Sequence, residues 1–219
     1  MQHWKREFID FALNNVGALK FGEFTLKSGR ISPYFFNAGL FNTGASLRKL
    51  ATAYTNTIFE SCCPVEIMYG PAYKGIPLVA SISVEMIHMS NNLTNMAWCF
   101  NRKEAKDHGE GGVIVGSKVT GRKVLIIDDV ISAGTSVRES VGIITKEGGE
   151  PTGVCIALDR QERGLESEFS AVQEVEREFD LPVTSIITMS DLVEYLQNEP
   201  GMEDDLANIL IYREQYGVN

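Results

Sequence analysis

Two adjacent carboxylates, Asp128 and Asp129, lie in the segment VLIIDDVISAGTSVRES, residues 124–140. The apolar run before them predicts a strand covered on both faces of a parallel sheet, which places the carboxylates at its end. Residues 132–136 are small and carry three hydroxyl groups, and a helix is expected next. Hydroxyls and the free N–H groups of a helix start can hold a phosphate. Because carboxylates repel phosphate, this pair suits the hydroxyls of an attached sugar, or Mg²⁺ bound directly or through water.

A plainer interpretation is that Asp128 and Asp129 only cap the helix that follows them. Two other phosphate-binding motifs are excluded. The chain has no G-x-x-x-x-G-K-[ST] segment, and GEGGVIVG (109–116) lacks the last glycine of the dinucleotide-binding pattern. An apolar strand, an acid pair and a loop of small residues together favour a sugar-phosphate site.

Three other segments that follow expected strands carry groups suited to anions: GPAYKG (70–75), FNRKEAKDHGEGG (100–112) and LDRQERG (158–164). In open parallel sheets, ligands bind at the carboxyl ends of the strands. Segment 100–112 combines cations with glycines, which suits a lid that closes over a polyanion. A solvated charged loop would have the same composition.

Individual side chains in and near these segments have two interpretations each. Lys74 can meet an anion as a point charge, or it can be an ordinary surface lysine. Arg160 can bind a substrate carboxylate in a fork, or it can form a salt bridge with Glu162. Phe35 and Phe36 are adjacent in an extended segment, so they should point to opposite faces, with one of them in the core.

The pattern of apolar residues predicts an α/β fold with a mostly parallel sheet, because strands and helices alternate through the middle of the chain. The expected strands are 65–70, 96–102, 123–129 and 151–160. The expected helices are an amphipathic one at the N-terminus, within residues 1–15, and others at 75–89, 136–149, 192–199 and 202–217.

The composition is that of an ordinary globular chain: 219 residues, 44% hydrophobic and 22% charged, with a net charge of −9. Residues 161–219 hold 14 acids and three bases. Nucleic-acid-binding domains are usually basic, so we expect no nucleic-acid partner, whereas the slight positive excess of residues 1–160 permits an anionic small ligand. No apolar run approaches the roughly 18 residues of a membrane span, and no signal peptide is recognisable, so we expect a cytoplasmic protein without a membrane partner.

The four cysteines form neither a zinc pattern nor a disulfide framework, because none belongs to a C-x-x-C pair. We expect all of them to be reduced and buried. They are Cys62, Cys63, Cys99 and Cys155.

Segment 124–140 closely resembles the phosphoribosyl-pyrophosphate signature of the type I phosphoribosyltransferases. Four further segments are similar, in the same order, to segments of the orotate phosphoribosyltransferases of bacterial and yeast type, which have a single function. These segments are FTLKSGRISPYFFNAG (24–39), GPAYKGIPL (70–78), NRKEAKDHGEGG (101–112) and LDRQERG (158–164). The resemblance implies a type I phosphoribosyltransferase fold, in which a twisted, mostly parallel sheet is flanked by helices. It also implies a small hood formed by residues 1–40 and the C-terminal part, within a single domain of residues 1–219.

The resemblance further implies the reaction and its residues. The phosphoribosyl group of phosphoribosyl pyrophosphate passes to orotate, which gives orotidine 5′-monophosphate and diphosphate on the pathway to UMP. The residues expected to bind the donor are Lys27, Tyr73, Lys74, Arg102, Lys103, Lys106, His108, Asp128, Asp129, Val130, Ile131, Ser132, Ala133, Gly134, Thr135 and Ser136. Those expected to bind orotate are Phe35, Phe36, Ser132 and Arg160. Those expected to act in catalysis are Arg102, Lys106, His108, Asp128 and Asp129.

The implied cofactor is Mg²⁺, held mainly by the donor diphosphate and ribose hydroxyls, with water-mediated contact to Asp128 and Asp129 as one arrangement. The implied assembly is a homodimer that shares the lid between subunits. Ser132 stands where many relatives carry threonine, and it keeps the hydroxyl. Two alternatives stay open, namely a phosphoribosyltransferase for another base and a non-catalytic module that senses phosphoribosyl pyrophosphate.

Overall fold

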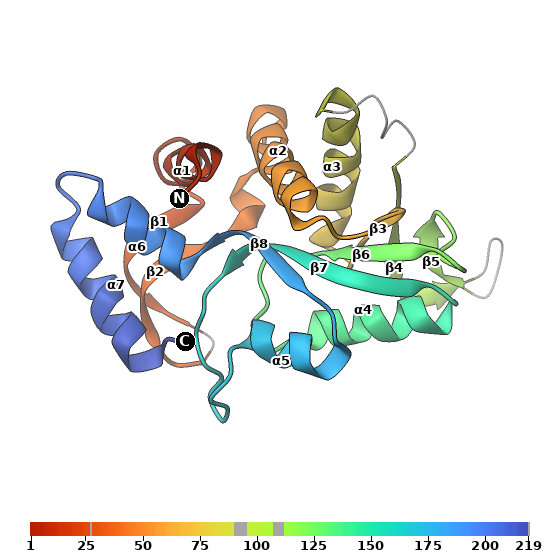
Figure 1. The fold of residues 1–219 in the computed structure, drawn as a ribbon. Coiled ribbons are helices and arrows are strands. Elements are labelled where there is room, and N and C mark those ends of the chain that lie inside the picture. The colour runs from red at the N-terminus through yellow and green to blue at the C-terminus, as the bar shows by residue number, and fades with distance from the viewer. Residues whose placement is uncertain (27, 90–95, 107–111, 219) are drawn as a thin grey trace.

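The computed structural model describes residues 1–26, 28–89, 96–106 and 112–218. Its centre is a six-stranded sheet with helices on both faces (Figure 1). The strands, in spatial order, are β5 (Gly112–Gly116), β4 (Ala97–Lys106), β3 (Ile67–Gly70), β6 (Lys123–Ile127), β7 (Glu150–Asp159) and β8 (Val183–Thr188). All neighbours run parallel except β4 and β5. The prediction of a mostly parallel sheet flanked by helices is confirmed.

Two pairs of helices cover the sheet, as Figure 1 shows above and below it. The helices above are α2 (Gly44–Ser61) and α3 (Gly75–Met89), and those below are α4 (Thr135–Lys146) and α5 (Ala171–Phe179). Strand β6 explains why both faces are covered. Its Leu125 and Ile127 belong to one buried apolar cluster, while Val124 and Ile126 belong to the other. Because successive side chains of a strand alternate between faces, a continuous apolar strand needs cover on both sides.

A second unit lies beside the sheet, at the left of Figure 1. It contains α1 (His3–Asp10), a π-helical turn (Phe11–Val16), β1 (Leu19–Thr25), β2 (Ile31–Phe36), a 3₁₀ turn (Ala38–Leu40), α6 (Met189–Gln197) and α7 (Glu203–Tyr216). We call residues 1–40 together with α6 and α7 the hood. Strand β2 contacts α7, and α1 contacts α6, so segments from opposite parts of the chain form this unit. Lys5 of α1 pairs with Asp191 of α6 at 3.3 Å.

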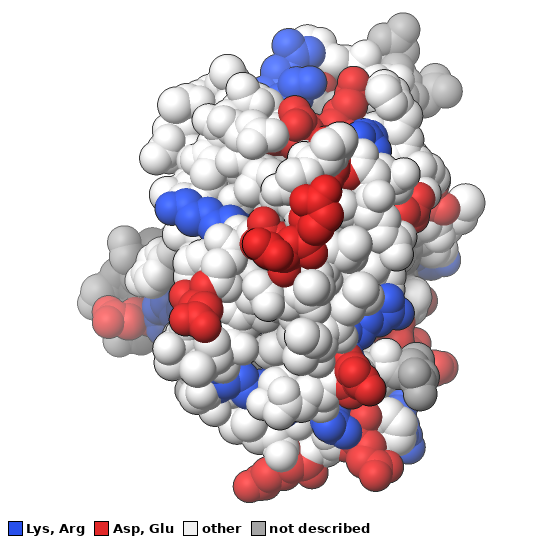
Figure 2. Space-filling model, turned by 90° about the vertical axis from the view of Figure 1, so that its left-hand side faces the viewer, with Lys and Arg blue, Asp and Glu red and all other residues white. Residues whose placement is uncertain are grey.

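Figure 2 looks at the side of the molecule that carries the hood. Groups of Asp and Glu side chains are visible there, and among the described residues no continuous basic patch crosses this face. None of the helices within the described ranges is long and apolar enough to cross a membrane.

The structure corrects three expectations. Strand β4 continues to Lys106, so the first half of the expected lid is a strand that pairs with β5, which was not predicted. The first helix is α-helical only to Asp10 and then continues as a π-helical turn. Cys62 is exposed and Cys63 is half-buried, so only Cys99 and Cys155 are the buried thiols that we expected; all four are free.

Candidate active site

The carboxyl ends of β3, β6 and β7 meet at one edge of the sheet. These three strands are parallel neighbours, with Tyr69 beside Ile126 and Ile127 beside Cys155. The segments that follow them therefore leave the sheet side by side, which is where ligands bind in open α/β folds. Segments 70–75, 124–140 and 158–164, which were selected from the sequence because they follow strands, therefore lie at the same edge of the sheet.

The acid pair at the end of β6 is buried and its backbone is held from two elements. The Asp128 N–H donates to the Cys155 carbonyl at 3.1 Å, and the Asp129 carbonyl accepts from the Ala157 N–H at 2.9 Å. From α2, the hydroxyl of Tyr54 donates to the Asp128 carbonyl at 2.7 Å. Tyr54 was not identified from the sequence. It lies 74 residues from Asp128, and no local pattern marks it.

The two carboxylates do not cap α4, so the plainer interpretation is wrong. The residue before α4 is Gly134, and no side chain caps this helix. Instead, Asp128 Oδ1 accepts from the Asp129 N–H and Asp129 Oδ1 accepts from the Val130 N–H, both at 2.9 Å. Burial, together with the neighbouring charge of Asp129, raises the pKa of Asp128, while a hydrogen bond from Ser136 partly opposes this.

The loop between β6 and α4 presents its polar groups outward. Gly134 has φ 72°, a left-handed conformation that glycine adopts without strain. A Cβ atom at this position would also lie 3.2 Å from Val175 Cγ2 of α5. Ile131 is buried and anchors the loop. The residues of the loop that are exposed are Ser132, Ala133, Thr135 and Ser136.

The turn between β3 and α3 is unusually tight. A Cβ at Gly70 would lie 2.2 Å from the Gly75 carbonyl oxygen, so the two glycines let the chain fold back on itself. Tyr73 and Lys74 are exposed in this turn, and the Ala72–Tyr73 peptide bond is cis. Lys74 Nζ donates to Asp129 Oδ2 at 2.6 Å. The structure thus brings together a predicted diphosphate-binding lysine and a predicted ribose-binding carboxylate.

Asn101 holds this turn from the neighbouring strand. It is buried in β4, and its Oδ1 accepts from the Ala72 N–H at 2.8 Å. Asn101 is the first residue of segment 101–112, but no role was predicted for it from the sequence. Its position between an apolar strand and a run of cations was the only signal for it.

The described part of the lid is the C-terminal end of strand β4, which carries two of the predicted cations. Lys103 Nζ lies 3.8 Å from Glu139 Oε2 of α4, so it is already paired. Arg102 Nε is buried and has no hydrogen-bond partner among the described residues. Three further predicted groups lie outside the described part of the structure: Lys27, His108 and the side chain of Lys106.

Arg160, which directly follows β7, is part of a buried polar cluster with the hood. Its Nη2 donates to Ser32 Oγ at 2.8 Å and lies 2.6 Å from Glu162 Oε1. Its guanidinium carbon lies 4.3 Å from the ring centroid of Tyr34. Burial favours the neutral form, but Tyr34 and Glu162 outweigh it and raise the pKa of Arg160, so the guanidinium stays charged. The salt-bridge interpretation of Arg160 is confirmed.

The paired phenylalanines of β2 point to opposite faces, as predicted. Phe36 is buried beside Phe41, with ring centroids 6.4 Å apart. Phe35 is partly exposed and stacks on Phe24 at 5.5 Å. Phe36 is therefore a core residue, and Phe35 has a surface that a planar ligand could contact.

The acid pair fits a Mg²⁺ ion that is held mainly by a substrate. Within the described ranges, no group of three or more His, Cys, Asp or Glu residues could hold a metal. Asp129 Oδ2 nonetheless faces a cation, the ammonium of Lys74. Mg²⁺ commonly takes one or two carboxylates and completes its shell with phosphate oxygens and water.

The class of protein follows from a match to a known domain family. The family model of the phosphoribosyl transferase domain matches residues 42–186, which cover the central sheet as far as Ile186 and exclude the hood. Curated orotate phosphoribosyltransferases of Thioalkalivibrio sulfidiphilus and Yersinia enterocolitica are each 54% identical over 218 residues, with both chains fully covered. The crystal structure of the Francisella tularensis orotate phosphoribosyltransferase is 45% identical, with a TM-score of 0.87 over 96% of this chain and 99% of that one. The chain belongs to the orotate phosphoribosyltransferase family.

Proposed function

We propose that this chain transfers the 5-phosphoribosyl group from phosphoribosyl pyrophosphate to orotate, and so forms orotidine 5′-monophosphate and diphosphate in de novo UMP synthesis. The observation that carries this proposal is full-length identity of 52–54% to curated orotate phosphoribosyltransferases. The placement of the candidate residues at one sheet edge supports it.

In the proposed complex, the donor spans two of the strand ends. Its 5′-phosphate lies in the loop of residues 130–136, at the start of α4, where N–H groups and hydroxyls face outward. Asp128 and Asp129 accept hydrogen bonds from the ribose hydroxyls. The diphosphate lies at the turn of residues 71–74 and the start of α3. Lys74 would then exchange Asp129 for the diphosphate, which carries the greater negative charge, and Mg²⁺ bound by the donor would replace the lost cation beside Asp129.

Mg²⁺ bound by the donor, with contact to Asp128 and Asp129, would neutralise charge on the departing diphosphate. The protein's own share is electrostatic. Arg102, Lys103 and the lid groups supply cations near the same oxygens, where negative charge grows in the transition state. Lys103 must first leave Glu139, which costs little because both side chains are substantially exposed.

No protein nucleophile is required, since a ring nitrogen of orotate attacks the anomeric carbon directly. The protein holds nitrogen, carbon and leaving oxygen in line. It must also exclude water, because a ribose carbon with cationic character reacts readily with it. We assign this task to the segment between β4 and β5.

On the base side, Phe35 offers a ring face and Ser132 offers a hydroxyl. Arg160 binds the orotate carboxylate with the edge that Glu162 and Ser32 leave free. Its buried Nε, which has no partner among the described residues, is the atom best placed to gain one. Uracil lacks the carboxylate, so it would leave Arg160 without this partner.

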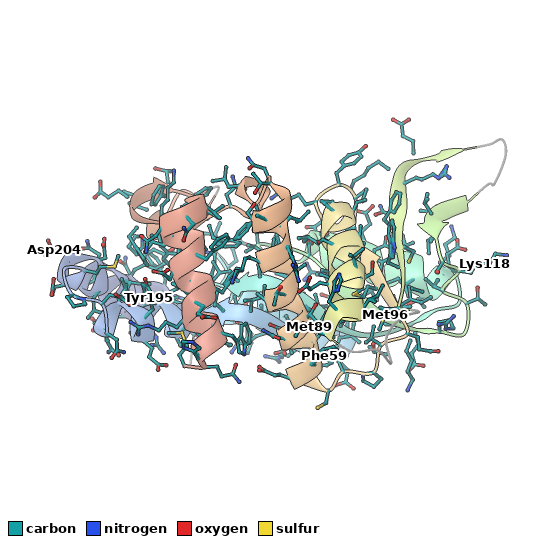
Figure 3. The ribbon with its side chains drawn as sticks, turned by 90° about the horizontal axis from the view of Figure 1, so that it is seen from above. Phe59, Met89, Met96, Lys118, Tyr195 and Asp204 are labelled. Carbon is teal, nitrogen blue, oxygen red and sulfur yellow. The ribbon has the colours of Figure 1, made fainter. Side chains whose placement is uncertain are left out.

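We further propose a homodimer that shares the lid, with residues 1–219 as one domain capped by the hood. Exposed apolar side chains on α3 support the pairing, namely Val84, Ile87 and Met89, with Phe59 of α2 nearby. Figure 3, which views this face from above, labels Phe59 and Met89 at the same end of the two helices. A cytoplasmic location and the lack of a nucleic-acid partner stay predictions.

The test follows orotate absorbance with time in the presence of the chain, the donor and Mg²⁺, with uracil and adenine in parallel. Loss of orotate that requires both donor and metal supports the proposal. Turnover of another base alone would retain the fold and reject the role of Arg160. Donor binding without turnover of any base would favour a sensing module.

A further inference from the structure

Arg138 of α4 makes two contacts that the proposed reaction does not use. Its Nη1 donates to the Ala133 carbonyl at 2.5 Å, and its Nε donates to Glu178 Oε2 of α5 at 2.7 Å. The guanidinium therefore joins the loop of residues 130–136 to two helices. Ala133 belongs to this loop, and within the described ranges no other side chain forms a hydrogen bond with its carbonyl oxygen.

The orientation of the Ala133–Gly134 peptide decides what the loop can bind. A trans peptide is planar, so its C=O and its N–H point in opposite directions. Because Arg138 holds the Ala133 oxygen on its own side, the Gly134 N–H must point away from Arg138. Within the described ranges, this N–H has no backbone acceptor.

A flip of this peptide would turn a carbonyl oxygen toward a bound phosphate in place of an N–H. That exchange replaces an attractive contact with a repulsive one. Glycine at position 134 makes such a flip possible, because it tolerates both signs of φ. A contact that fixes the carbonyl therefore determines whether the loop is a cradle for anions.

We propose that Arg138 is a positioning residue for the phosphate loop, held in place by Glu178, and that it keeps the Gly134 N–H directed at the 5′-phosphate of the donor. This inference rests on the proposed function of the loop. Arg138 touches no substrate in this account and acts only through the Ala133–Gly134 peptide.

The chain offers a matched control in the pair Arg122–Glu66. Arg122 Nε lies 3.0 Å from Glu66 Oε1, and the two side chains are 43% and 45% exposed, against 37% and 43% for Arg138 and Glu178. Arg122 and Glu66 precede β6 and β3, so this pair lies at the opposite edge of the sheet. Substitution of either arginine therefore removes an exposed Arg–Glu pair, but of the two arginines only Arg138 contacts the phosphate loop.

The experiment compares Arg138→Met with Arg122→Met by steady-state kinetics and by calorimetric titration with ribose 5-phosphate and with diphosphate. For Arg138→Met we expect the KM for the donor and the Kd for ribose 5-phosphate to rise about tenfold, which corresponds to about 1.4 kcal/mol. The Kd for diphosphate and the KM for orotate should stay within about twofold, and Arg122→Met should change none of these values. Arg138→Lys, which can keep the carbonyl contact alone, should recover part of the affinity.

Two results would overturn the proposal. One is an unchanged Kd for ribose 5-phosphate in Arg138→Met. The other is an equal loss for ribose 5-phosphate and diphosphate, which indicates general damage. If Arg138→Met does not fold, Glu178→Gln gives the same test with a smaller expected rise of about threefold. The titrations need no base, so a failure of the orotate assay would leave this test intact.

Discussion

The donor side and the base side of the proposed active site are assembled in different ways. On the donor side, Asp128, Asp129 and the phosphate loop follow β6 without interruption, and Lys74 follows β3 within a four-residue turn. On the base side, Arg160 follows β7, but Ser32 and Tyr34 come from the hood and lie more than 120 residues away in the chain. The first side depends on strand ends, and the second depends on how the hood packs against the sheet.

Affinity for the donor and choice of base should therefore be separable. Groups fixed by the sheet and its turns should hold the donor even when the hood is perturbed. Groups fixed by the hood should set the base without changing donor affinity.

The largest effect is expected for Asp129→Asn. The substitution keeps an oxygen for the Val130 N–H but removes the charge that Lys74 now meets and that the ribose and Mg²⁺ would need. We expect kcat/KM for the donor to fall about 10²- to 10³-fold, because an interaction of the reacting complex is lost. Steady-state kinetics at saturating orotate will measure it.

The control is Asp204→Asn, which removes an exposed carboxylate of α7, far from the sheet edge (Figure 3). It should leave kcat/KM unchanged. A fall of less than tenfold for Asp129→Asn would contradict the role of the acid pair.

The second prediction concerns Arg160→Met. Loss of the guanidinium should raise the KM for orotate about 10- to 100-fold, because a hydrogen-bonded ion pair with the carboxylate disappears. The KM for the donor should change less than about threefold if the two sides are independent. Kinetics with each substrate varied in turn will measure both values.

A thermal melt must accompany Arg160→Met, because this variant removes the partner that lies 2.6 Å from the largely buried Glu162 and leaves it, among the described residues, only the cation of Arg30, at 4.0 Å. Equal increases in both KM values would contradict the independence of the two sides, since they would mean that the hood also affects donor binding. An unchanged KM for orotate would remove Arg160 from the base site.

The third prediction uses two tyrosines that are both fully buried. The hydroxyl of Tyr54 donates to the Asp128 carbonyl, whereas the hydroxyl of Tyr34 has no partner among the described residues. Tyr54→Phe should lower the free energy of unfolding by about 1–3 kcal/mol and weaken donor binding, because a buried carbonyl loses its donor. Tyr34→Phe should change the free energy of unfolding by less than about 0.5 kcal/mol.

Urea denaturation of the two variants will measure the difference. Equal losses of stability would show that the Tyr54 bond contributes nothing specific to the acid pair. Weaker orotate binding by Tyr34→Phe, without loss of stability, would show that its hydroxyl contacts the base.

The smallest effect concerns pH. Since burial and Asp129 raise the pKa of Asp128, the folded protein keeps this proton to a higher pH than the unfolded chain does. Stability therefore decreases as the pH rises through this interval, and Asp128→Asn avoids that loss. We expect the stability of the variant relative to wild type to rise as the pH increases above the ordinary aspartate pKa of about 4.

Urea denaturation at a series of pH values, with Asp204→Asn as the control, will measure the trend. A stability difference that does not change with pH would mean that Asp128 ionises in the folded protein as it does in the unfolded chain.

Local patterns in the sequence identified four of the six strands, β3, β4, β6 and β7, and the main donor segments, but they identified neither β5 nor β8. Residues 123–127 form a continuous apolar strand, and a parallel strand buried on both faces has that composition. The loop after it also depends on adjacent residues. The charged segment that continues β4 to Lys106 could not be predicted as a strand, because its composition has little tendency to form one. Its strand conformation depends on pairing with β5.

The remaining features depend on contacts between distant residues, for which one sequence contains no signal. The bond from Tyr54 to Asp128 and the bond from the Ala72 N–H to Asn101 join separate elements of the fold. The hood strands β1 and β2 mix polar and apolar residues, so they became recognisable only through their mutual pairing. Arg160 was identified, but its pairing with Ser32 was not.

We predict that this sheet edge joins a phosphoribosyl donor to orotate and to no other base. The most direct measurement supplies orotate, uracil and adenine together at equal concentration, with phosphoribosyl pyrophosphate and Mg²⁺, and identifies the nucleotides formed by chromatography and mass. We predict orotidine 5′-monophosphate as the sole nucleotide, formed in equal amount with diphosphate. Formation of uridine or adenosine monophosphate, or of no nucleotide while ribose 5-phosphate still binds, would contradict the account.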